Sequence, residues 1–226
     1  MIIKFQQQTL DFPERDDADQ SVIKEIFFWR EYRAAEELIT QSRSIVDAGA
    51  HIGAWSAYAA LLSPKAKVYA LEPEKGNLSQ LKETIKKNKL KTVKIIDQAL
   101  AGQTGPRKLQ IASDSINHTL LPLDSQEPGK TVSAISLADF LSKTKIKEID
   151  FLKMDIEGGE YELLDAWQAA DFSKIKNIIL EYHKIENRDF KELESRLREN
   201  GFSVQIFPSR FDKNLGFILA RNKNLK

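Results

Sequence analysis

Short apolar runs alternate with helical patterns along most of the chain. Runs that are hydrophobic on both faces are typical of buried parallel strands, and apolar residues at i, i+3 and i+4 spacing are typical of helices. Strands are expected at residues 44–48, 67–71, 93–96, 149–154 and 176–182, and helices at 54–62, 77–88, 137–141, 160–169 and 190–200. This alternation predicts an α/β fold built on a mostly parallel sheet.

The two ends of the chain depart from this alternation. Two strands, at 203–207 and 216–220, close the chain with no helix between them, which predicts an antiparallel hairpin at one edge of the sheet. Residues 1–43 are expected to form an N-terminal helical extension that buries Ile23, Ile26 and Phe27. The chain is therefore divided into this extension and one domain at 44–226.

The segment 101–130 is rich in turn residues around one expected strand at 108–112. Loops of this length often carry binding residues, so the segment is expected to shape a substrate pocket.

Composition narrows the function classes. With 34 basic and 33 acidic side chains the net charge is +1, which gives no general attraction for a polyanion, so no nucleic-acid partner is expected. The chain has no cysteine, which excludes a disulfide, a cysteine nucleophile and a thiolate metal site. No apolar stretch approaches about 18 residues and the first residues lack a signal-peptide pattern, so no membrane span and a cytoplasmic location are expected.

Residues 45–53, Ile-Val-Asp-Ala-Gly-Ala-His-Ile-Gly, carry the most informative pattern. An apolar strand ends near Asp47, and Gly49 and Gly53 lie four residues apart before a helix. Glycine permits a tight turn and a close ligand, and the helix start presents unpaired N–H groups. The Asp47 carboxylate would repel a pyrophosphate but attract the ammonium group of S-adenosylmethionine (SAM). His51 replaces the middle glycine of G-x-G-x-x-G, so an ordinary strand-to-helix turn is the alternative.

Polar residues follow the next two strands. Glu72, 25 residues after Asp47, lies where the ribose hydroxyls of an adenosine cofactor are found in such folds, and Pro73 stiffens the turn. Gln98 and Ala99 follow the third strand and are expected to face the adenine. The candidate cofactor-binding residues are Asp47, Ala48, Gly49, His51, Gly53, Glu72, Pro73, Gln98, Ala99 and Asp155.

Together these segments resemble the FkbM family of SAM-dependent methyltransferases over residues 25–221. The matching segments are 45–56, 71–74, 98–100 followed by Gly105, 149–161, which resembles the family signature, and 180–183. The resemblance implies a class I methyltransferase, a Rossmann-like fold with a seven-stranded, mostly parallel sheet in the order 3-2-1-4-5-7-6. It also implies methyl transfer from SAM, usually to a hydroxyl oxygen of a sugar, polyketide or other small natural product. His51 departs from the asparagine usual in the family.

The candidate catalytic residues are Asp155, Glu157 and His183, which follow two neighbouring strands. An alcohol must lose its proton as it is methylated, and His183 is the preferred general base. Each residue also has a non-catalytic interpretation. Asp155 would only position the cofactor or substrate, Glu157 would be an acid at the start of a helix, and His183 would form a structural hydrogen bond. These three also form a possible Mg²⁺ or Mn²⁺ ligand set, but no H-x-x-H or E-x-x-H motif supports one, so no metal is expected.

Two other functions stay open. An oxidoreductase of the NAD type has a similar topology, but the missing middle glycine, Asp47 and the lack of a Tyr-x-x-x-Lys pair disfavour it. A non-catalytic binding or scaffold module would keep the fold without turnover. Outside the domain, Arg30, Tyr32 and Arg33 resemble a family segment that either caps the site or docks on the sheet, and Trp29 and Trp55 are interpreted as packing residues.

Overall fold

The computed structural model describes residues 1–110, 118–120, 129–183, 185, 188–209 and 215–225. Within these ranges the chain forms a central sheet of seven strands in the order β11-β12-β10-β9-β3-β4-β5. The strands are β3 (Ser44–Ala48), β4 (Lys67–Leu71), β5 (Val93–Ile96), β9 (Ile149–Met154), β10 (Ile175–His183), β11 (Phe202–Pro208) and β12 (Leu215–Asn222). β12 runs antiparallel to both neighbours and the other pairs are parallel. Strand order and terminal hairpin match the expectation from the sequence.

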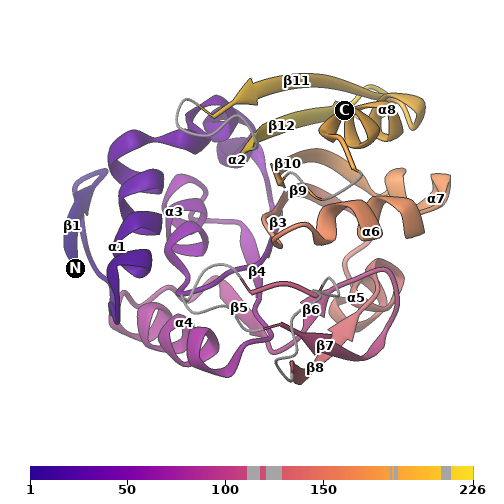
Figure 1. Cartoon of the computed structure of the whole chain (residues 1–226). Coiled ribbons are helices and arrows are strands. Elements are labelled where there is room, and N and C mark those ends of the chain that lie inside the picture. The colour runs from indigo at the N-terminus through magenta and orange to yellow at the C-terminus, as the bar shows by residue number, and fades with distance from the viewer. Residues whose placement is uncertain (111–117, 121–128, 184, 186–187, 210–214, 226) are drawn as a thin grey trace.

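Helices cover both faces of this sheet, and Figure 1 shows α3 and α4 on one side and α6 and α8 on the other. The helices after the first strand of the sheet are α3 (Ala54–Leu62), α4 (Lys75–Lys87), α5 (Leu137–Thr144), α6 (Gly159–Ala166), α7 (Ala169–Phe172) and α8 (Phe190–Glu199). None of the helices in the described ranges combines the length and the apolar character that a membrane span requires.

The central strands are apolar on both sides because each side faces its own core. Successive residues of a strand point to opposite faces. Accordingly, Ile45 of β3 and Phe151 of β9 join the core beneath α3, whereas Val46 and Leu152 join the core beneath α5, α6 and α8.

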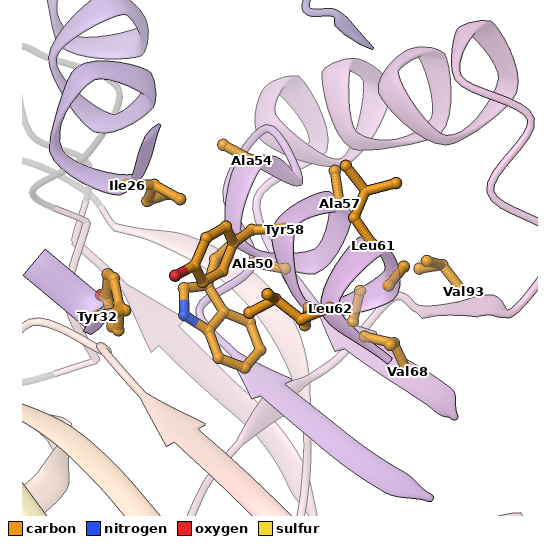
Figure 2. Packing of buried hydrophobic residues seen from close by; sticks show 14 of the residues in the cluster. Ile26, Tyr32, Ala50, Ala54, Ala57, Tyr58, Leu61, Leu62, Val68 and Val93 are labelled. Carbon is orange, nitrogen blue, oxygen red and sulfur yellow. The ribbon is translucent and has the colours of Figure 1, made fainter. Parts of the chain in front are cut away.

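Helix α3 is buried along its whole length and lies close to the sheet. Its small side chains, such as Ala54 and Ala57, allow this close approach, and Trp55 stacks on Phe151 with ring centroids 6.0 Å apart. In Figure 2, Ile26 from the N-terminal segment lies on the same side of α3 as Tyr58. The N-terminal segment therefore contributes to the same core as the helix after the first central strand.

The first residues form a β-hairpin, where the sequence had suggested helix. β1 (Ile2–Phe5) pairs with β2 (Gln8–Asp11), and the turn places Gln6 and Gln7 at φ 44° and 63°. Such a turn usually carries Asn-Gly or Asp-Gly, so these glutamines gave no hairpin signal. The helical part follows as α1 (Asp17–Lys24), η1 (Glu25–Trp29), η2 (Glu31–Ala35) and α2 (Glu36–Gln41). The division at residues 43 and 44 stays a prediction.

The segment after β5 forms a second small sheet. In the described part of the chain this sheet has three strands, β6 (Ala99–Leu100), β7 (Gly105–Leu109) and β8 (Lys130–Ile135), in the order β6-β8-β7. The strand expected at 108–112 begins earlier, at Gly105, and residues 111 and 112 lie outside the described ranges. β8 was not expected, although the polar–apolar alternation of residues 131–134 is typical of a half-buried strand.

Asp150 fastens the starts of three central strands. Its Oδ2 accepts hydrogen bonds from the backbone N–H groups of Arg43 and Ser44, each at 2.9 Å, and Oδ1 lies 3.1 Å from Nζ of Lys176. Burial alone would raise the pKa of Asp150, but these donors lower it below its ordinary value. The ionised carboxylate therefore stabilises the fold at neutral pH.

We predict that Asp150→Ala lowers the free energy of unfolding by about 1–3 kcal/mol, because it leaves two backbone donors without their acceptor. Urea denaturation at neutral pH measures this loss. The matched control is Asp97→Ala, at an exposed acid after β5, which should stay within about 0.5 kcal/mol of the parent protein. Equal losses in the two variants would contradict the role given to Asp150.

Candidate functional site

A cavity of about 1070 Å³ opens at the carboxyl ends of the central strands. Its walls come from the turn after β3, the end of β4, the segment after β9 and the end of β10, and from η1, η2 and the β11–β12 hairpin. Ligands in open α/β sheets bind at this edge, where the strand order reverses. The cavity is therefore the candidate functional site.

Two glycines shape the turn beneath the cavity. Gly49 has φ +79°, and a Cβ atom there would lie 1.8 Å from the carbonyl oxygen of Asp155. Gly53 has φ +85°, and a Cβ would lie 2.5 Å from Cδ1 of Leu81. Both positions thus favour glycine for its conformation, and at Gly49, which lines the cavity, the neighbouring backbone also leaves no space for a Cβ atom. The turn forms a backbone cradle of the kind that lets a cofactor approach closely.

A buried lysine lies behind this turn. Lys153 is 3% exposed, and its Nζ donates a hydrogen bond to the carbonyl of Gly49 at 2.8 Å. The same nitrogen lies 3.3 Å from Asp47 and 3.4 Å from Asp155. Burial alone would lower the pKa of Lys153, but the two carboxylates raise it, so the ammonium is charged. Asp47 is fully buried and also accepts from Oγ of Ser56 at 2.6 Å, so it holds the lysine instead of lining the cavity.

Glu72 presents a buried carboxylate to the cavity. It is 5% exposed, and its two oxygens accept from the backbone N–H groups of His51 and Glu74, each at 2.8 Å. Burial raises the pKa of Glu72 despite these hydrogen bonds. Because a carboxylate has about four acceptor positions, it can still accept hydrogen bonds from a bound diol. The two N–H donors fix the direction in which it does so.

The N-terminal segment is bonded to the glycine turn through a polar network. Arg15 Nη2 donates to Asp19 Oδ1 at 3.0 Å and to Oδ1 of Asn77 at 2.7 Å, and Asp19 Oδ1 lies 3.2 Å from Nε2 of His51. Burial alone would raise the pKa of Asp19, but its bonds with His51 and Arg15 bring it well below 3.8. His51 itself has φ 49°, a left-handed conformation that is uncommon outside glycine. Helix α1 is thus tied directly to the loop that lines the cavity.

The three candidate catalytic residues lie at the cavity together. Nε2 of His183 lies 3.3 Å from Oε2 of Glu157, and Nδ1 lies 3.8 Å from Oε1 of Glu160. Burial alone would lower the pKa of His183, but the carboxylates of Glu160, Glu157 and Asp155 raise it above 6.5. Glu157 has φ 53°, the kind of strained backbone often found at functional sites. Glu160 is fully buried and accepts a hydrogen bond from the backbone N–H of Ile156, which is a structural role.

Sequence reasoning missed four further acids in the same cavity: Glu25, Glu31, Glu162 and Glu181. Burial together with Glu25 and Asp155 raises the pKa of Glu31 to about 7. Burial, Asp155 and Glu157 raise the pKa of Glu181 well above its ordinary value. The sequence could have indicated Glu181, because it lies near the end of β10, two residues before His183. Glu25 and Glu31 carried none, because they lie in irregular helical turns outside the strand-end pattern.

The predicted cofactor-binding residues separate into two sets. Those lining the cavity are Gly49, His51, Glu72, Pro73, Ala99 and Asp155, whereas Asp47, Ala48, Gly53 and Gln98 do not line it. The amide of Gln98 is bonded instead to Oγ of Ser133 at 3.0 Å and to Nζ of Lys143 at 2.5 Å. The roles of these residues in cofactor binding stay predictions.

The tryptophans and the N-terminal segment differ in burial and in whether they line the cavity. Trp55 is buried, as expected for packing, but Trp29 is 55% exposed and lines the cavity, so its interpretation as a packing residue was wrong. It follows the exposed Phe28 at the end of η1, in which Ile26 and Phe27 are the buried residues. Tyr32 is buried and lines the cavity with Arg30, whereas Arg33 is exposed. The segment thus both docks on the sheet and forms part of the cavity wall.

Comparison with known proteins agrees with this geometry. A family model described as the methyltransferase FkbM domain matches residues 47–204. The 31-O-demethyl-FK506 methyltransferase FkbM of Streptomyces tacrolimicus is 23% identical over 216 residues, which cover 82% of each chain. The hexuronic acid methyltransferase AglP of Haloferax volcanii is 24% identical over 209 residues, which cover 89% of this chain and 83% of that one.

A solved structure shares the fold. The magnesium protoporphyrin IX methyltransferase of Synechocystis, crystallised with bound SAM, aligns with a TM-score of 0.53 at 13% identity, covering 92% of this chain and 82% of that chain. Its similarity concerns the fold alone. With the sheet order and the terminal hairpin, it confirms the class I methyltransferase fold expected from the sequence.

We predict that Asp19→Asn destabilises the protein at neutral pH and that this difference shrinks in acid. Because the folded pKa of Asp19 is depressed, its stabilisation is present above pH 3.8 and is lost as pH falls through the folded pKa. Unfolding free energies of both proteins at about pH 7 and about pH 3 measure the effect. Asp17→Asn in the same helix is the control and should show no such convergence. A difference that is the same at both pH values would contradict the predicted role.

Proposed function

The chain belongs to the FkbM family of methyltransferases, and from this premise we propose that it transfers the methyl group of SAM to a hydroxyl oxygen of a small acceptor, a sugar, polyketide or other natural product. One observation carries the proposal: a single cavity joins the glycine turn and Glu72 at one end to an acid–imidazole cluster at the other. A cofactor held at the first end can reach an acceptor held at the second.

The residues at the first end fit the adenosyl part of SAM. The absence of a Cβ at Gly49 leaves room beside the backbone, and the Glu72 carboxylate faces the cavity with acceptor positions to spare for the two ribose hydroxyls. Lys153 neutralises Asp47 and Asp155 only in part, because one ammonium faces two carboxylates. A cationic sulfonium and ammonium suit such a surplus of negative charge.

The names of two relatives support an oxygen acceptor. One is named for 31-O-demethyl-FK506 and the other for a hexuronic acid, and both are small oxygen-rich molecules. In this chain the wall of the same cavity includes Trp29 and Phe207, which are 55% and 39% exposed. Aromatic faces of this kind suit the apolar face of a sugar or polyketide ring. The absence of a nucleic-acid partner stays a prediction.

The proposed reaction needs alignment and a proton acceptor. When bound, SAM supplies an electrophilic methyl group on a sulfonium. Asp155 orients the acceptor hydroxyl, and the Glu157–His183 pair takes its proton. As the acceptor oxygen bonds to the methyl carbon, the carbon–sulfur bond breaks and its electron pair stays on sulfur. Residues of η1 and η2 form part of the cavity wall, which limits the access of water to the methyl transfer.

The two other candidate functions have less support. An NAD-type oxidoreductase would place a pyrophosphate at the turn after β3, where Asp47 and Asp155 supply negative charge. A scaffold module would have no need for the strained Glu157 or for a histidine among carboxylates. Binding of SAM but not of NAD would exclude the oxidoreductase. Methyl transfer to any acceptor would exclude the non-catalytic module.

We predict that Glu72→Ala weakens binding of S-adenosylhomocysteine about 10- to 100-fold, because it removes the charged acceptor proposed for the ribose. Isothermal titration with S-adenosylhomocysteine and with NAD measures the effect, and NAD should not bind the parent protein. Glu83→Gln on the exposed side of α4 is the control and should bind as the parent does. Circular dichroism verifies that Glu72→Ala is folded. Parent-like affinity in a folded Glu72→Ala would contradict the proposed ribose contact.

We predict that Glu157→Gln lowers kcat at least about 100-fold and leaves the affinity for S-adenosylhomocysteine unchanged, because the amide cannot accept the proton. Transfer of a radiolabelled methyl group to a panel of hydroxylated acceptors measures kcat. The matched control is Glu162→Gln, which lines the same cavity but pairs with Arg107. If Glu157→Gln were as active as Glu162→Gln, the pair would have no role in proton transfer.

A further inference from the structure

Three potential metal ligands meet at the acceptor end of the cavity. Asp155, Glu181 and His183 each offer one ligand atom, and these three atoms lie within 4.8 Å of one another. The strand register explains their meeting, because Met154 of β9 pairs with Leu180 of β10 and brings the next residues, Asp155 and Glu181, side by side. The sequence had suggested Glu157 as the third possible ligand; the structure replaces it with Glu181.

The donor types select a class of ion. Two carboxylates and one imidazole are the ligands preferred by Mn²⁺ and, for the oxygens, by Mg²⁺. Ligand atoms around such ions, about 2.0–2.2 Å from the metal, are separated from one another by about 3–4 Å, so small side-chain rotations bring the three into place. All three residues line the cavity, so further coordination positions would face its interior.

Charge gives an independent reason for a cation at this point. Within the described residues, no hydrogen bond or ion pair reaches the Glu181 carboxylate, although the residue is partly buried. The buried cation of this cavity wall, Lys153, is already held by Asp47 and Asp155. Nδ1 of His183 is buried without a hydrogen-bond partner. Glu157, Glu25 and Glu31 add further negative charge to the same cavity. Such a collection of acids is stable only if protons or an added cation offset it.

We propose that Asp155, Glu181 and His183 hold a divalent cation of the Mn²⁺ or Mg²⁺ type, which positions the acceptor's hydroxyl group for methyl transfer. The metal site stands on the geometry of the three ligands, and its role in the reaction rests on the proposed function. With the imidazole engaged as a ligand, the hydroxyl proton goes to Glu157, the other member of the proposed pair. The methyl carbon gains the bond to oxygen, and the electron pair of the broken carbon–sulfur bond stays on sulfur.

The test is a titration of the full chain with Mn²⁺. Electron paramagnetic resonance measures the concentration of free Mn²⁺ at each point, and the bound amount follows by difference. We expect saturable binding of about one Mn²⁺ per chain, displaced by excess Mg²⁺. Glu181→Gln should weaken it at least about tenfold, because a carboxamide is a poorer ligand. Glu162→Gln, an acid of the same cavity outside the cluster, should bind Mn²⁺ as the parent does. Circular dichroism shows in parallel that each variant is folded, whether or not it binds S-adenosylhomocysteine.

The outcomes separate the metal site from the proposed function. No saturable Mn²⁺ binding by a folded parent protein would overturn the metal site, and so would equal affinities in Glu181→Gln and Glu162→Gln. Binding that depends on Glu181 supports the site even if no tested acceptor is methylated. Methyl transfer that EDTA abolishes and Mn²⁺ restores supports its role in the reaction. Full activity in EDTA would overturn that role while leaving the methyltransferase function intact.

Discussion

The buried ammonium of Lys153 joins the two strands on which the site is built. It bonds to the carbonyl of Gly49 after β3 and lies between Asp47 on β3 and Asp155 after β9. A buried charge is tolerated only with close partners, so removing the ammonium would leave two carboxylates, one of them the fully buried Asp47, without their counter-charge. The turn proposed to hold the cofactor and the acid proposed to face the acceptor are thereby held in one fixed relation.

The two ends of the cavity differ in how fully their carboxylates are paired. On the cofactor side, Glu72 is fixed by backbone donors, and His51 is bonded to the N-terminal segment through Asp19. On the side proposed for the acceptor, carboxylates outnumber their partners, and burial together with these neighbouring charges raises the pKa values of Glu31 and Glu181. This asymmetry suits a cationic methyl donor on one side and a deprotonating hydroxyl, aided by a metal ion, on the other.

Much of the fold followed from local pattern because its strands are buried on both faces. The helix at 54–62 and the strands at 67–71, 93–96 and 149–154 were predicted with their observed bounds. The strand order, by contrast, came from the family resemblance. The N-terminal hairpin was missed because two glutamines replace the usual turn residues.

The site was predicted less completely, for reasons of side-chain direction. Asp155, Glu157 and His183 were found because strand ends meet at one edge of a parallel sheet. Lys153 was missed because a lysine within a strand is usually exposed, and only its two acidic partners, distant in sequence or outside the strand, make it a core residue. Gln98 follows its strand as expected, but Ser133 and Lys143 hold its amide away from the cavity.

A crystal structure of the chain with bound S-adenosylhomocysteine tests the central claim most directly, because it locates the cofactor without depending on an acceptor. The account predicts ribose hydroxyls within hydrogen-bond distance of Glu72, the backbone of Gly49 beside the cofactor, and the sulfur atom directed toward Asp155 and His183. A cofactor bound elsewhere, or a ribose that makes no contact with Glu72, would contradict it.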